Sequence, residues 1–418
     1  MKTIVMKFGG TSLANIERMQ HVAGHIEREF NKGFRVIVIV SAMAGETDRL
    51  INLANKIEGN LDLSERDILI SSGEQASAAL LAMILKAKGI KAKSWLGWQL
   101  PIKTDDMHGS ARITHVDKND LENNFNVDEI SIVAGFQGVS NKNRITTLGR
   151  GGSDTSAIAI ACAIEADICD IYTDVDGVYT ADPRIVPKAQ RLEKVSYEEM
   201  LEMASLGAKV LQTRSVELGM TNGLSMRVRS TFDDHAIDDN INDQKSIGTI
   251  VCEEDEILEH KVVSGIAYSK DEAKITLTKL NDNPGIAALV FGSLADNGIN
   301  VDMIVQNISS DGKYTDLTFT VPASDIKRAT VMIESLKDSI QYDKLLGSRD
   351  IVKVSVIGVG MRSHSGVAAL MFKTLAAKGI NILAITTSEI KVSVLIDAQH
   401  LEMAVKSLHT AYNLDKNI

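Results

Sequence analysis

The chain has 418 residues, of which 44% are hydrophobic and 24% charged, and its formal net charge at pH 7 is −10. This composition is typical of a globular protein with two or three domains. The negative charge argues against a general nucleic-acid binder or a membrane-surface binder, because either partner would repel the chain. It does not exclude a small anionic substrate, since a local site can be basic on an acidic protein.

Cysteine usage and the N-terminus indicate the compartment. The three cysteines, Cys162, Cys169 and Cys252, form no C-x-x-C pair, so neither a disulfide framework nor a cysteine-zinc site is expected. The N-terminus shows no signal-peptide pattern, and no apolar run approaches the roughly 20 residues needed to span a bilayer. These features predict a cytoplasmic protein in a reducing compartment.

Strand-like and helix-like segments alternate up to about residue 230. Apolar runs predict strands at 3–8, 35–42, 130–136, 168–173 and 224–230. Helical spacing predicts helices over 13–30, 64–88 and 155–165. Such alternation predicts an α/β sandwich with a mainly parallel sheet, in which ligands bind at the carboxyl ends of the strands.

The alternation stops at residues 231–260. This segment contains ten acidic residues and one lysine. So strong a charge bias predicts an acidic connector or a solvated surface outside the core, and therefore a domain boundary.

The last third of the chain contains an internal repeat. "GIAALVFGSLADNGINV", from Gly285, and "GVAALMFKTLAAKGINI", from Gly366, begin 81 residues apart and share ten of seventeen positions. A strand-like run precedes each copy, and two strands and a helix follow it. The repeat indicates either a purely structural duplication or a pair of small-molecule sensors.

The two copies differ in their supply of strands. The first can take its fourth strand from 342–351, whereas the second ends in a helix and lacks one. Because open sheet edges are normally paired or covered, the strand-like run at 261–269 is expected to complete the second copy. The first module, 270–351, would then be inserted within the second, which is formed by 261–269 and 352–418.

The clearest candidate for an anion site is the turn after the first strand. Lys7 is followed by Gly9 and Gly10, whose backbone N–H groups can point into one concavity at the start of a helix. The alternative is a tight turn with a solvated lysine.

A second glycine cluster, "LGRGGSDTS" at 148–156, also opens a helix. Arg150 offers a planar fork suited to a carboxylate or a phosphate, and Asp154 could orient Lys7 or a metal ion. The same residues also fit a plain helix start capped by Ser153 or Asp154.

Other candidates follow further predicted strands or lie in helices. Ser41 and Thr47 flank the loop "SAMAGET", which also reads as an ordinary loop. Glu74 could bind a substrate ammonium or only complement a helix dipole. Asp174 lies in "YTDVDGVYTADPR", where Asp176-Gly177 also signals a surface hairpin. Lys209 lies in an apolar run and needs a partner. The chain lacks both the P-loop and the G-x-G-x-x-G motif.

The motifs "KFGGTS", "SAMAGET", "SSGEQ", "GRGGSDTSA" and "YTDVDGVYTADPR", in this order, resemble those of the aspartokinases of the amino-acid kinase family. The repeat resembles a pair of ACT domains. The resemblance covers essentially the whole chain and, without a homoserine dehydrogenase extension, points to the monofunctional form. It implies an α/β fold: a three-layer amino-acid kinase domain over 1–230 with a mainly parallel central sheet, followed by two βαββαβ, ferredoxin-like ACT domains.

The resemblance implies transfer of phosphate from ATP, with Mg²⁺, to the β-carboxylate of L-aspartate. This reaction opens the aspartate pathway to lysine, threonine and methionine. The implied catalytic residues are Lys7 and Asp154. The residues implied to bind the substrate are Thr47, Glu74, Arg150 and Ser153. The residues implied to bind ATP are Lys7, Gly9, Gly10, Ser41, Thr173, Asp174, Tyr179, Arg184 and Lys209. No motif identifies a protein ligand for the metal, and no general base is needed, since the substrate carboxylate is already an anion at pH 7.

The ACT pair implies feedback by lysine, threonine or both, and a homo-oligomer, dimer or tetramer, formed through these domains. The implied effector-binding residues are Asp282, Ala287, Asp302, Gln306, Asn307, Ser309, Thr315 and Thr318. The alternative is that these polar groups only pair across a dimer interface.

Two rival functions remain open at this stage. One is a sister kinase of the same fold acting on glutamate, acetylglutamate or a nucleotide, although such enzymes lack paired ACT modules. The other is an amino-acid sensor with a decayed kinase half, against which the presence of Lys7, Glu74, Arg150 and Asp154 argues.

Overall fold

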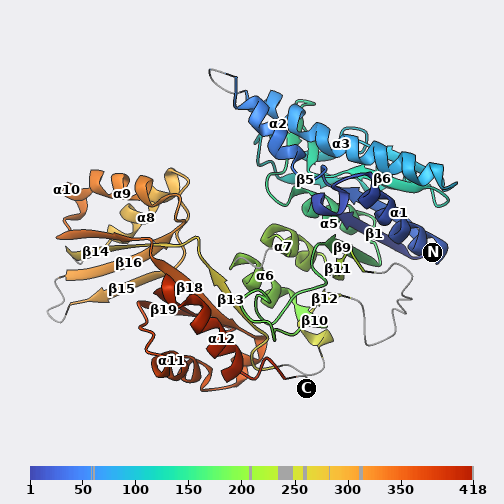
Figure 1. The fold of residues 1–418 in the computed structure, drawn as a ribbon. Helices are drawn as coiled ribbons and strands as arrows, with labels where there is room; N and C mark the ends of the chain where they lie inside the picture. Colours follow the sequence, from blue (N-terminus) through green and yellow to red (C-terminus); the bar gives the residue numbers. More distant parts are fainter. Residues whose placement is uncertain are drawn as a thin grey trace. The chain divides into compact units, whose positions relative to one another are not determined.

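The computed structural model describes residues 1–57, 59, 62–206, 210–233, 248–257, 261–281, 283–309 and 314–416 (Figure 1). The chain forms two compact units. The first unit is built from residues 1–178, 191–205 and 209–259, and the second from residues 179–190, 206–208 and 260–418.

An eight-stranded sheet forms the centre of the first unit, in the order β10-β12-β11-β9-β1-β2-β6-β3. In that order the strands are Lys194–Ser196, Thr249–Cys252, Met226–Ser230, Ile168–Thr173, Thr3–Phe8, Arg35–Val40, Ile130–Ala134 and Ala92–Trp95. All neighbouring pairs are parallel except β11 and β12. The expected mainly parallel α/β sheet is therefore confirmed.

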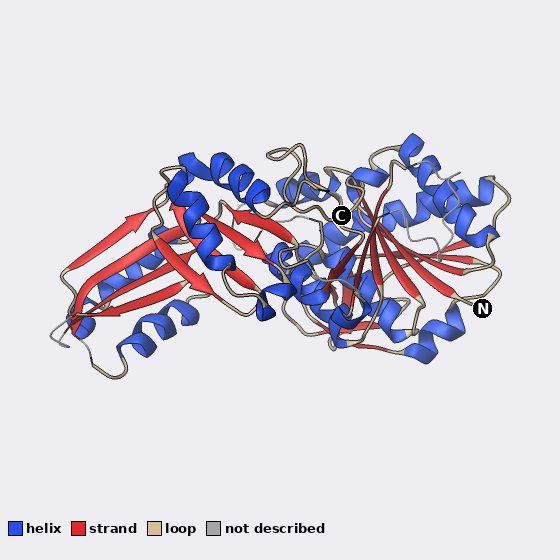
Figure 2. Cartoon of the chain, turned by 90° about the horizontal axis from the view of Figure 1, so that it is seen from below, coloured by secondary structure: helices blue, strands red, loops and turns tan. Residues whose placement is uncertain are grey.

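Helices cover both faces of this sheet, as the blue helices on either side of the red strands show in Figure 2. One face packs against α1 (Ile16–Asn31) and α3 (Leu63–Ala87), and the other against α5 (Gly152–Ala163). The β-branched runs of β1 and β2 are buried on both sides, which is why they show no polar alternation. The remaining helical segments of this unit are η1 (Gly10–Leu13), α2 (Glu46–Ala54), α4 (Lys118–Asn124), α6 (Tyr197–Ser205), α7 (Thr213–Thr221) and η2 (Glu254–Glu256).

A second, smaller sheet of the first unit was not expected from the sequence. Its order is β5-β4-β7-β8, formed by Ile113–Val116, Ile102–Thr104, Gln137–Ser140 and Ile145–Thr147. The strands are only three or four residues long, too short for periodicity to reveal. This sheet leads directly into the glycine cluster that begins at Leu148.

Helix α3 corrects the expectation about apolar runs. By length and composition this 25-residue helix could cross a membrane. Half of its most apolar window is buried, however, and it packs against β2, β3 and β6. Its apolarity is therefore that of a core helix.

The acidic segment 231–260 also departs from expectation. Within it, β12 (Thr249–Cys252) joins the central sheet, and Val251 and Cys252 are fully buried. The prediction that this segment stays outside the core is wrong for these four residues, because a short apolar strand lies between its acidic runs.

The second unit contains two four-stranded sheets, each covered by helices. The first module has the order β15-β16-β14-β17, formed by Ile304–Ile308, Tyr314–Val321, Ala273–Asn281 and Lys344–Ser348. Its helices are α8 (Ile286–Asp296), α9 (Ile326–Ser335) and α10 (Lys337–Ile340). The second module has the order β13-β18-β20-β19, formed by Gly265–Ser269, Ile351–Ile357, Lys391–Asp397 and Ala384–Thr387. Its helical segments are η3 (Val359–Ser363), α11 (Val367–Ala377), η4 (Ala398–His400) and α12 (Leu401–Ala411).

The chain enters the second module before it builds the first. β13 pairs antiparallel with β18, whereas the strands of the first module all lie between these two in sequence. A strand from before the first module thus closes the edge of the second module's sheet.

Residues 179–190 differ from their predicted assignment to a continuous 1–230 domain. Ala181, Ile185 and Val186 are buried in the core of the second module. The Ile266 N–H donates to the carbonyl of Thr180 at 2.8 Å. Because these apolar side chains are buried among those of the second module, the segment belongs to the second unit.

Candidate active site

The carboxyl ends of the central strands meet at one rim of the first unit. The Ser41 N–H donates to Phe8 O at 3.1 Å, and the Gly9 N–H donates to Tyr172 O at 3.4 Å. These bonds join the ends of β1, β2 and β9 and bring together loops that are more than 100 residues apart in sequence. The rim is the position at which open α/β sheets bind ligands.

Lys7 and Asp154 meet at this rim. The Nζ atom of Lys7 lies 2.5 Å from Oδ1 of Asp154, and the two residues are only 9% and 7% exposed. Asp154 is in the first turn of α5, which Gly151 starts from a left-handed conformation with φ of 70°. A largely buried ion pair of this kind holds a positive charge in a fixed place.

The two glycines after β1 leave room beside Lys7. A Cβ atom at Gly9 would lie 3.6 Å from Lys7 Nζ, and one at Gly10 would lie 2.9 Å from Ala42 O. A side chain at Gly10 would therefore clash with the backbone, and one at Gly9 would fill the space next to the ammonium. A bare backbone beside a fixed cation fits a phosphate group.

Glu74 contributes a buried acid from the middle of α3. Its Oε1 accepts a hydrogen bond from the Ala42 N–H at 3.0 Å, whereas its buried Oε2 has no hydrogen-bond partner. Burial raises the pKa of this carboxyl to about 7, and the bond from Ala42 opposes the rise. An acceptor atom left without a partner suits a ligand that brings a donor.

The other predicted substrate residues lie in neighbouring loops and helix starts. Ser153 is buried in the first turn of α5, and a Cβ at Gly135, just after β6, would touch its Cβ at 3.0 Å. Thr47 is the second residue of α2 and is half-buried. Arg150 is exposed in the turn before α5.

Besides Lys7, Gly9, Gly10 and Ser41 at the rim, the predicted nucleotide residues fall into three groups. Thr173 is the last residue of β9, the strand beside β1, and Asp174 is the next residue. The Thr173 hydroxyl donates to Asp174 Oδ1 at 3.1 Å. Tyr179 and Arg184 belong to the second unit, where the exposed Arg184 pairs with Asp182 at 2.8 Å. Lys209 lies outside the described residues.

Three of the predicted effector residues, Ala287, Gln306 and Thr315, line a cavity of about 410 Å³ in the first module. Its walls come from the end of β14, the start of α8 and the strands β15 and β16. No charged side chain is among the described residues that line it.

Four other effector candidates, Asp302, Asn307, Ser309 and Thr318, are not among the described residues that line this cavity. Asp302 forms an ion pair with Lys353 of the second module, and Thr318 bonds to Thr276 at 2.9 Å. Asn307 accepts from the Thr315 hydroxyl through its carbonyl, and Ser309 accepts from the Tyr314 N–H. Asp282 lies outside the described residues.

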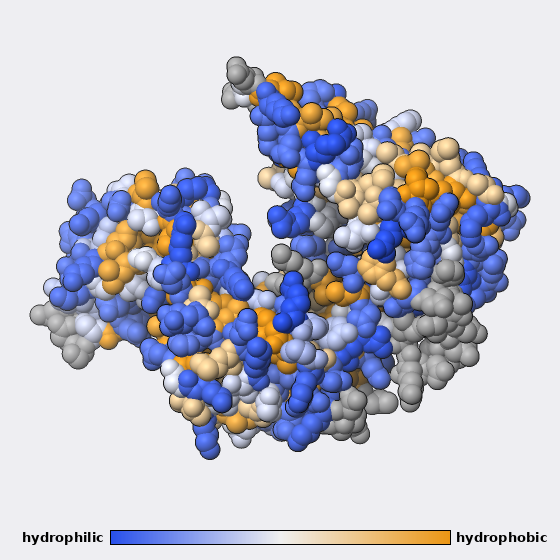
Figure 3. Space-filling model, in the orientation of Figure 1, coloured by the Kyte–Doolittle hydropathy of each residue, from blue (hydrophilic) through white to orange (hydrophobic). Residues whose placement is uncertain are grey.

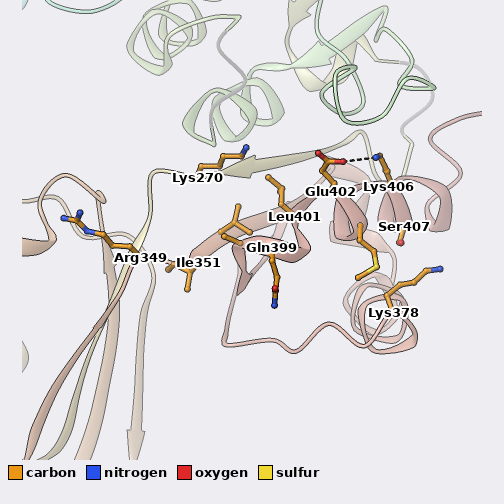
Figure 4. Close-up of a pocket in the computed structure, with 12 residues that line it drawn as sticks. Lys270, Arg349, Ile351, Lys378, Gln399, Leu401, Glu402, Lys406 and Ser407 are labelled. Atoms are coloured by element: carbon orange, nitrogen blue, oxygen red, sulfur yellow. Dashed lines mark hydrogen bonds and ion pairs between the residues drawn. The ribbon is translucent and has the colours of Figure 1, made fainter.

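A larger cavity, of about 820 Å³, lies in the second module and contains none of the predicted residues. Figure 4 shows that two of its cations, Arg349 and Lys378, point in opposite directions, and that Lys406 pairs with Glu402 at 3.0 Å. The cations of this cavity therefore do not converge on one point.

The sequence analysis missed several buried charged residues. Asp170 of β9 pairs with Arg227 and Arg229 of β11 at 2.8 and 3.3 Å, fully inside the first unit. Burial alone would raise the pKa of Asp170, but the two guanidinium groups hold it below its ordinary value. Asp67 of α3 is fully buried as well. The sequence could have indicated Asp67 through its spacing of seven residues from Glu74, because this spacing places both carboxyl groups on one face of the helix.

No group of three His, Cys, Asp or Glu side chains in the described parts of the chain could hold a metal ion. The rim instead offers Asp154, paired with Lys7, beside the Gly9–Gly10 turn, which has no side chains. This donor set fits a metal that is bound mainly through nucleotide phosphates and water, as Mg²⁺ usually is.

Comparisons with known proteins agree with this geometry. The amino-acid kinase family model matches residues 2–230, and the ACT domain model matches residues 278–335 and 354–412. Aspartate kinase Ask_LysC of Stutzerimonas stutzeri is 47% identical over 416 residues, which cover 99% of this chain and 98% of that protein.

Two solved structures extend the comparison. E. coli aspartokinase III in complex with aspartate and ADP is 26% identical with a TM-score of 0.79, over 98% of this chain and 99% of that one. The same enzyme with lysine and aspartate has a TM-score of 0.76 at 26% identity, over 99% of this chain and all of the other. The amino-acid kinase fold, the ACT pair and full-length identity near one half together show that the chain belongs to the aspartokinase family.

Proposed function

We propose that the rim formed by β1, β2 and β9 is the site at which this aspartate kinase moves the γ-phosphoryl group of ATP to the β-carboxylate of L-aspartate. The observation that carries this proposal is the buried ion pair of Lys7 and Asp154 beside the Gly9–Gly10 turn. A bond forms between a carboxylate oxygen and the γ-phosphorus, and the bond from phosphorus to the bridging oxygen of ADP breaks.

Lys7 and the Gly9–Gly10 backbone act on the transferred group. Phosphoryl transfer needs positioning and charge neutralisation more than covalent help from the protein. Asp154 holds the Lys7 ammonium in place before the substrates arrive, so that little reorganisation is needed during the reaction. Bound Mg²⁺ supplies further positive charge on the phosphates.

Aspartate is bound at both of its ends. Oε2 of Glu74 accepts from the α-ammonium, and the fork of Arg150 binds a carboxylate, assisted by Ser153 and Thr47. The unpaired Oε2 supports the first role. The nucleotide is bound by Ser41, Thr173 and Asp174 at the ends of β2 and β9. Tyr179, Arg184 and Lys209 stay predictions from the family resemblance.

The cavity beside α8 is the proposed effector site. Its lining by Gln306, Thr315 and Ala287 supports binding of a small amino acid, lysine or threonine. Inhibition requires that the effector bind a less active state more tightly, because a ligand shifts an equilibrium only by its differential affinity. The structural relative E. coli aspartokinase III forms a complex with lysine and aspartate, which supports lysine as a candidate effector.

The wider organisation follows the same proposal. A kinase domain, which lacks 179–190 and gains β12, precedes two ACT domains, the first inserted in the second, and β13 paired with β18 supports the insertion. The second unit exposes hydrophobic side chains, seen as orange areas at the left of Figure 3, and Ile304, Ile308 and Ile385 on its edge strands are among the exposed ones. These support a homo-oligomer, dimer or tetramer, formed through the ACT domains of a cytoplasmic enzyme.

A hydroxamate assay tests the reaction. Purified protein with ATP, Mg²⁺ and hydroxylamine should yield a hydroxamate with L-aspartate and none with glutamate or acetylglutamate. Repeating the assay with lysine, threonine and both together tests the effector. Turnover of glutamate alone would favour a sister kinase, whereas effector binding without any turnover would favour a sensor.

A further inference from the structure

Helix α3 presents a second buried carboxyl group, Asp67, on the same face as Glu74 but two turns earlier. Glu74 bonds to the Ser41–Thr47 loop, whereas Asp67 bonds to the two loops around the glycine cluster. Asp67 is fully buried, so it cannot be a group that only solvates the helix surface.

The Asp67 carboxyl accepts from three residues. The hydroxyl of Thr147 donates to Oδ1 at 2.6 Å, and its N–H donates to Oδ2 at 3.1 Å. The Gly109 N–H lies within 3.1 Å of both oxygens, and His108 Nδ1 lies 2.8 Å from Oδ2. One side chain therefore connects the end of β8 with the loop at 105–111.

A second charged side chain joins the same two segments from α7. Arg214 donates to Leu148 O at 3.2 Å and to Ala111 O at 3.1 Å. The segments also touch directly, since a Cβ at Gly149 would lie 3.3 Å from Gly109 O, and φ of 75° at Gly149 favours glycine. Arg150 is the next residue after Gly149. The backbone that carries Arg150 is thus held by charged anchors, although the Arg150 side chain is exposed.

We propose that Asp67 is a positioning residue for aspartate binding, which fixes the turn carrying Arg150 by holding Thr147 and Gly109 together. This inference rests on the proposed role of Arg150. In this proposal Asp67 acts through that turn and not by contact with a substrate. Its effect is expected on aspartate affinity, because Arg150 is proposed to bind the substrate and not the transferred phosphoryl group, and loss of uniform binding raises KM without lowering kcat.

The test is steady-state kinetics of Asp67→Asn in the full-length enzyme. An amide turns one acceptor into a donor facing N–H groups, so at least one bond is lost without loss of volume. The KM for aspartate should rise about tenfold, while kcat and the KM for ATP stay within about twofold. An unchanged aspartate KM would overturn the proposal.

Asp62→Ala is the matched control. Asp62 caps the same helix, accepting from the N–H groups of Ser64 and Glu65, and touches neither loop. Its loss should lower helix stability by about 1 kcal/mol and leave the aspartate KM unchanged. If Asp62→Ala shifted the aspartate KM as much as Asp67→Asn, helix stability would explain the effect and the proposal would fall.

Thr147 variants keep the test open if Asp67→Asn does not fold. Thr147→Val loses the hydroxyl bond to Asp67 and should raise the aspartate KM, whereas Thr147→Ser keeps the hydroxyl and should restore it. Equal KM values for the two variants would count against the proposal.

A double variant separates this inference from the proposed site. Arg150→Ala alone should raise the aspartate KM, and Asp67→Asn should add nothing in that background. Additive effects would show that Asp67 does not act through Arg150. If Arg150→Ala left the aspartate KM unchanged, both this inference and the proposed role of Arg150 would fail.

Discussion

The two units differ in the charge of their candidate sites, although each unit also buries an ion pair, in the second unit that of Lys353 and Glu272 at 2.6 Å. The first unit places ionised groups in its interior, such as Lys7 with Asp154 and Asp170 with Arg227, all less than 10% exposed. The cavity of the first module, in contrast, is lined by amides, a threonine hydroxyl and apolar groups among its described residues. Moving a phosphoryl group requires fixed charges, whereas sensing an amino acid requires only a difference in affinity between two states.

The largest expected effect is on stability, and it tests whether the buried charges of the first unit are structural. Arg227→Met should lower the free energy of unfolding by about 3–5 kcal/mol, because it leaves Asp170 buried without its bidentate partner. Urea unfolding followed by circular dichroism measures this loss. Arg328→Met, which breaks an exposed pair in the second unit, should cost about 1 kcal/mol or less. Equal losses would mean that burial of an ion pair does not set its contribution to stability.

Lys7→Ala tests whether catalysis depends on the first unit alone. We expect kcat to fall about 10²–10³-fold, since the variant removes a preorganised charge from the transferred group. Binding of lysine or threonine, measured by titration calorimetry, should not change. Lys93→Ala, which removes a cation lying 3.8 Å from the Trp95 ring, is the control and should keep its activity. Retention of wild-type kcat by Lys7→Ala would contradict the assignment.

Glu74 supplies a pH dependence. Its raised pKa, about 7, means that it is mostly protonated below pH 7, in a form that cannot pair with an ammonium. The apparent affinity for aspartate should therefore fall about tenfold from pH 8 to pH 6.

Glu74 also makes the stability of the protein depend on pH, but in the opposite direction to the aspartate affinity. Because folding raises the pKa of Glu74, its contribution to stability is largest at low pH and is lost as the pH rises to about 7. In Glu74→Gln, both the pH dependence of aspartate affinity and this contribution should disappear. A wild-type pH profile of aspartate KM in the variant would exclude Glu74 as the ammonium partner.

The smallest effect is expected in the second unit, where the two modules can be compared. Gln306→Ala should weaken inhibition by lysine or threonine about tenfold, through loss of a hydrogen bond in the cavity, and leave uninhibited kcat unchanged. Thr387 is the counterpart of Gln306 in the repeat, 81 residues later on β19. Thr387→Ala should leave the inhibition constant unchanged. Equal effects would mean that the modules share the sensing role.

The local sequence of the second module explains the expected difference. Where the first module has the cavity at the start of α8, the second has η3 (Val359–Ser363) before α11, and Arg362 pairs with Glu389 at 3.5 Å. The two copies of the repeat are similar in sequence, but the residues before their first helices differ, with a cavity in the first copy and an ion pair in the second.

The ion pair of Lys7 with Asp154, 147 residues later, agrees with the expectation that Asp154 orients Lys7. β1 ends at the carboxyl edge of the central sheet, as the topology rule predicts, whereas α5, which carries Asp154, follows β8 of the small sheet. The pairing of β13 with β18 likewise agrees with the expectation that a sheet edge is closed.

Sequence reasoning failed where burial depends on partners distant in the chain. β12 follows an acidic run, and residues 179–190 bury three apolar side chains in the second unit, although the residues on either side in sequence belong to the first. Apart from its spacing from Glu74, Asp67 gave no signal in the sequence, because its partners Thr147 and Gly109 are found only in the fold.

The central claim is that Lys7, held by Asp154, contacts the phosphoryl group in transit. A crystal structure with Mg²⁺, a β,γ-imido analogue of ATP and L-aspartate tests it most directly. The account predicts the Lys7 ammonium at about 3 Å from a γ-phosphate oxygen, with the ion pair to Asp154 retained. A γ-phosphate bound elsewhere, with the Lys7 ammonium facing only water, would contradict it.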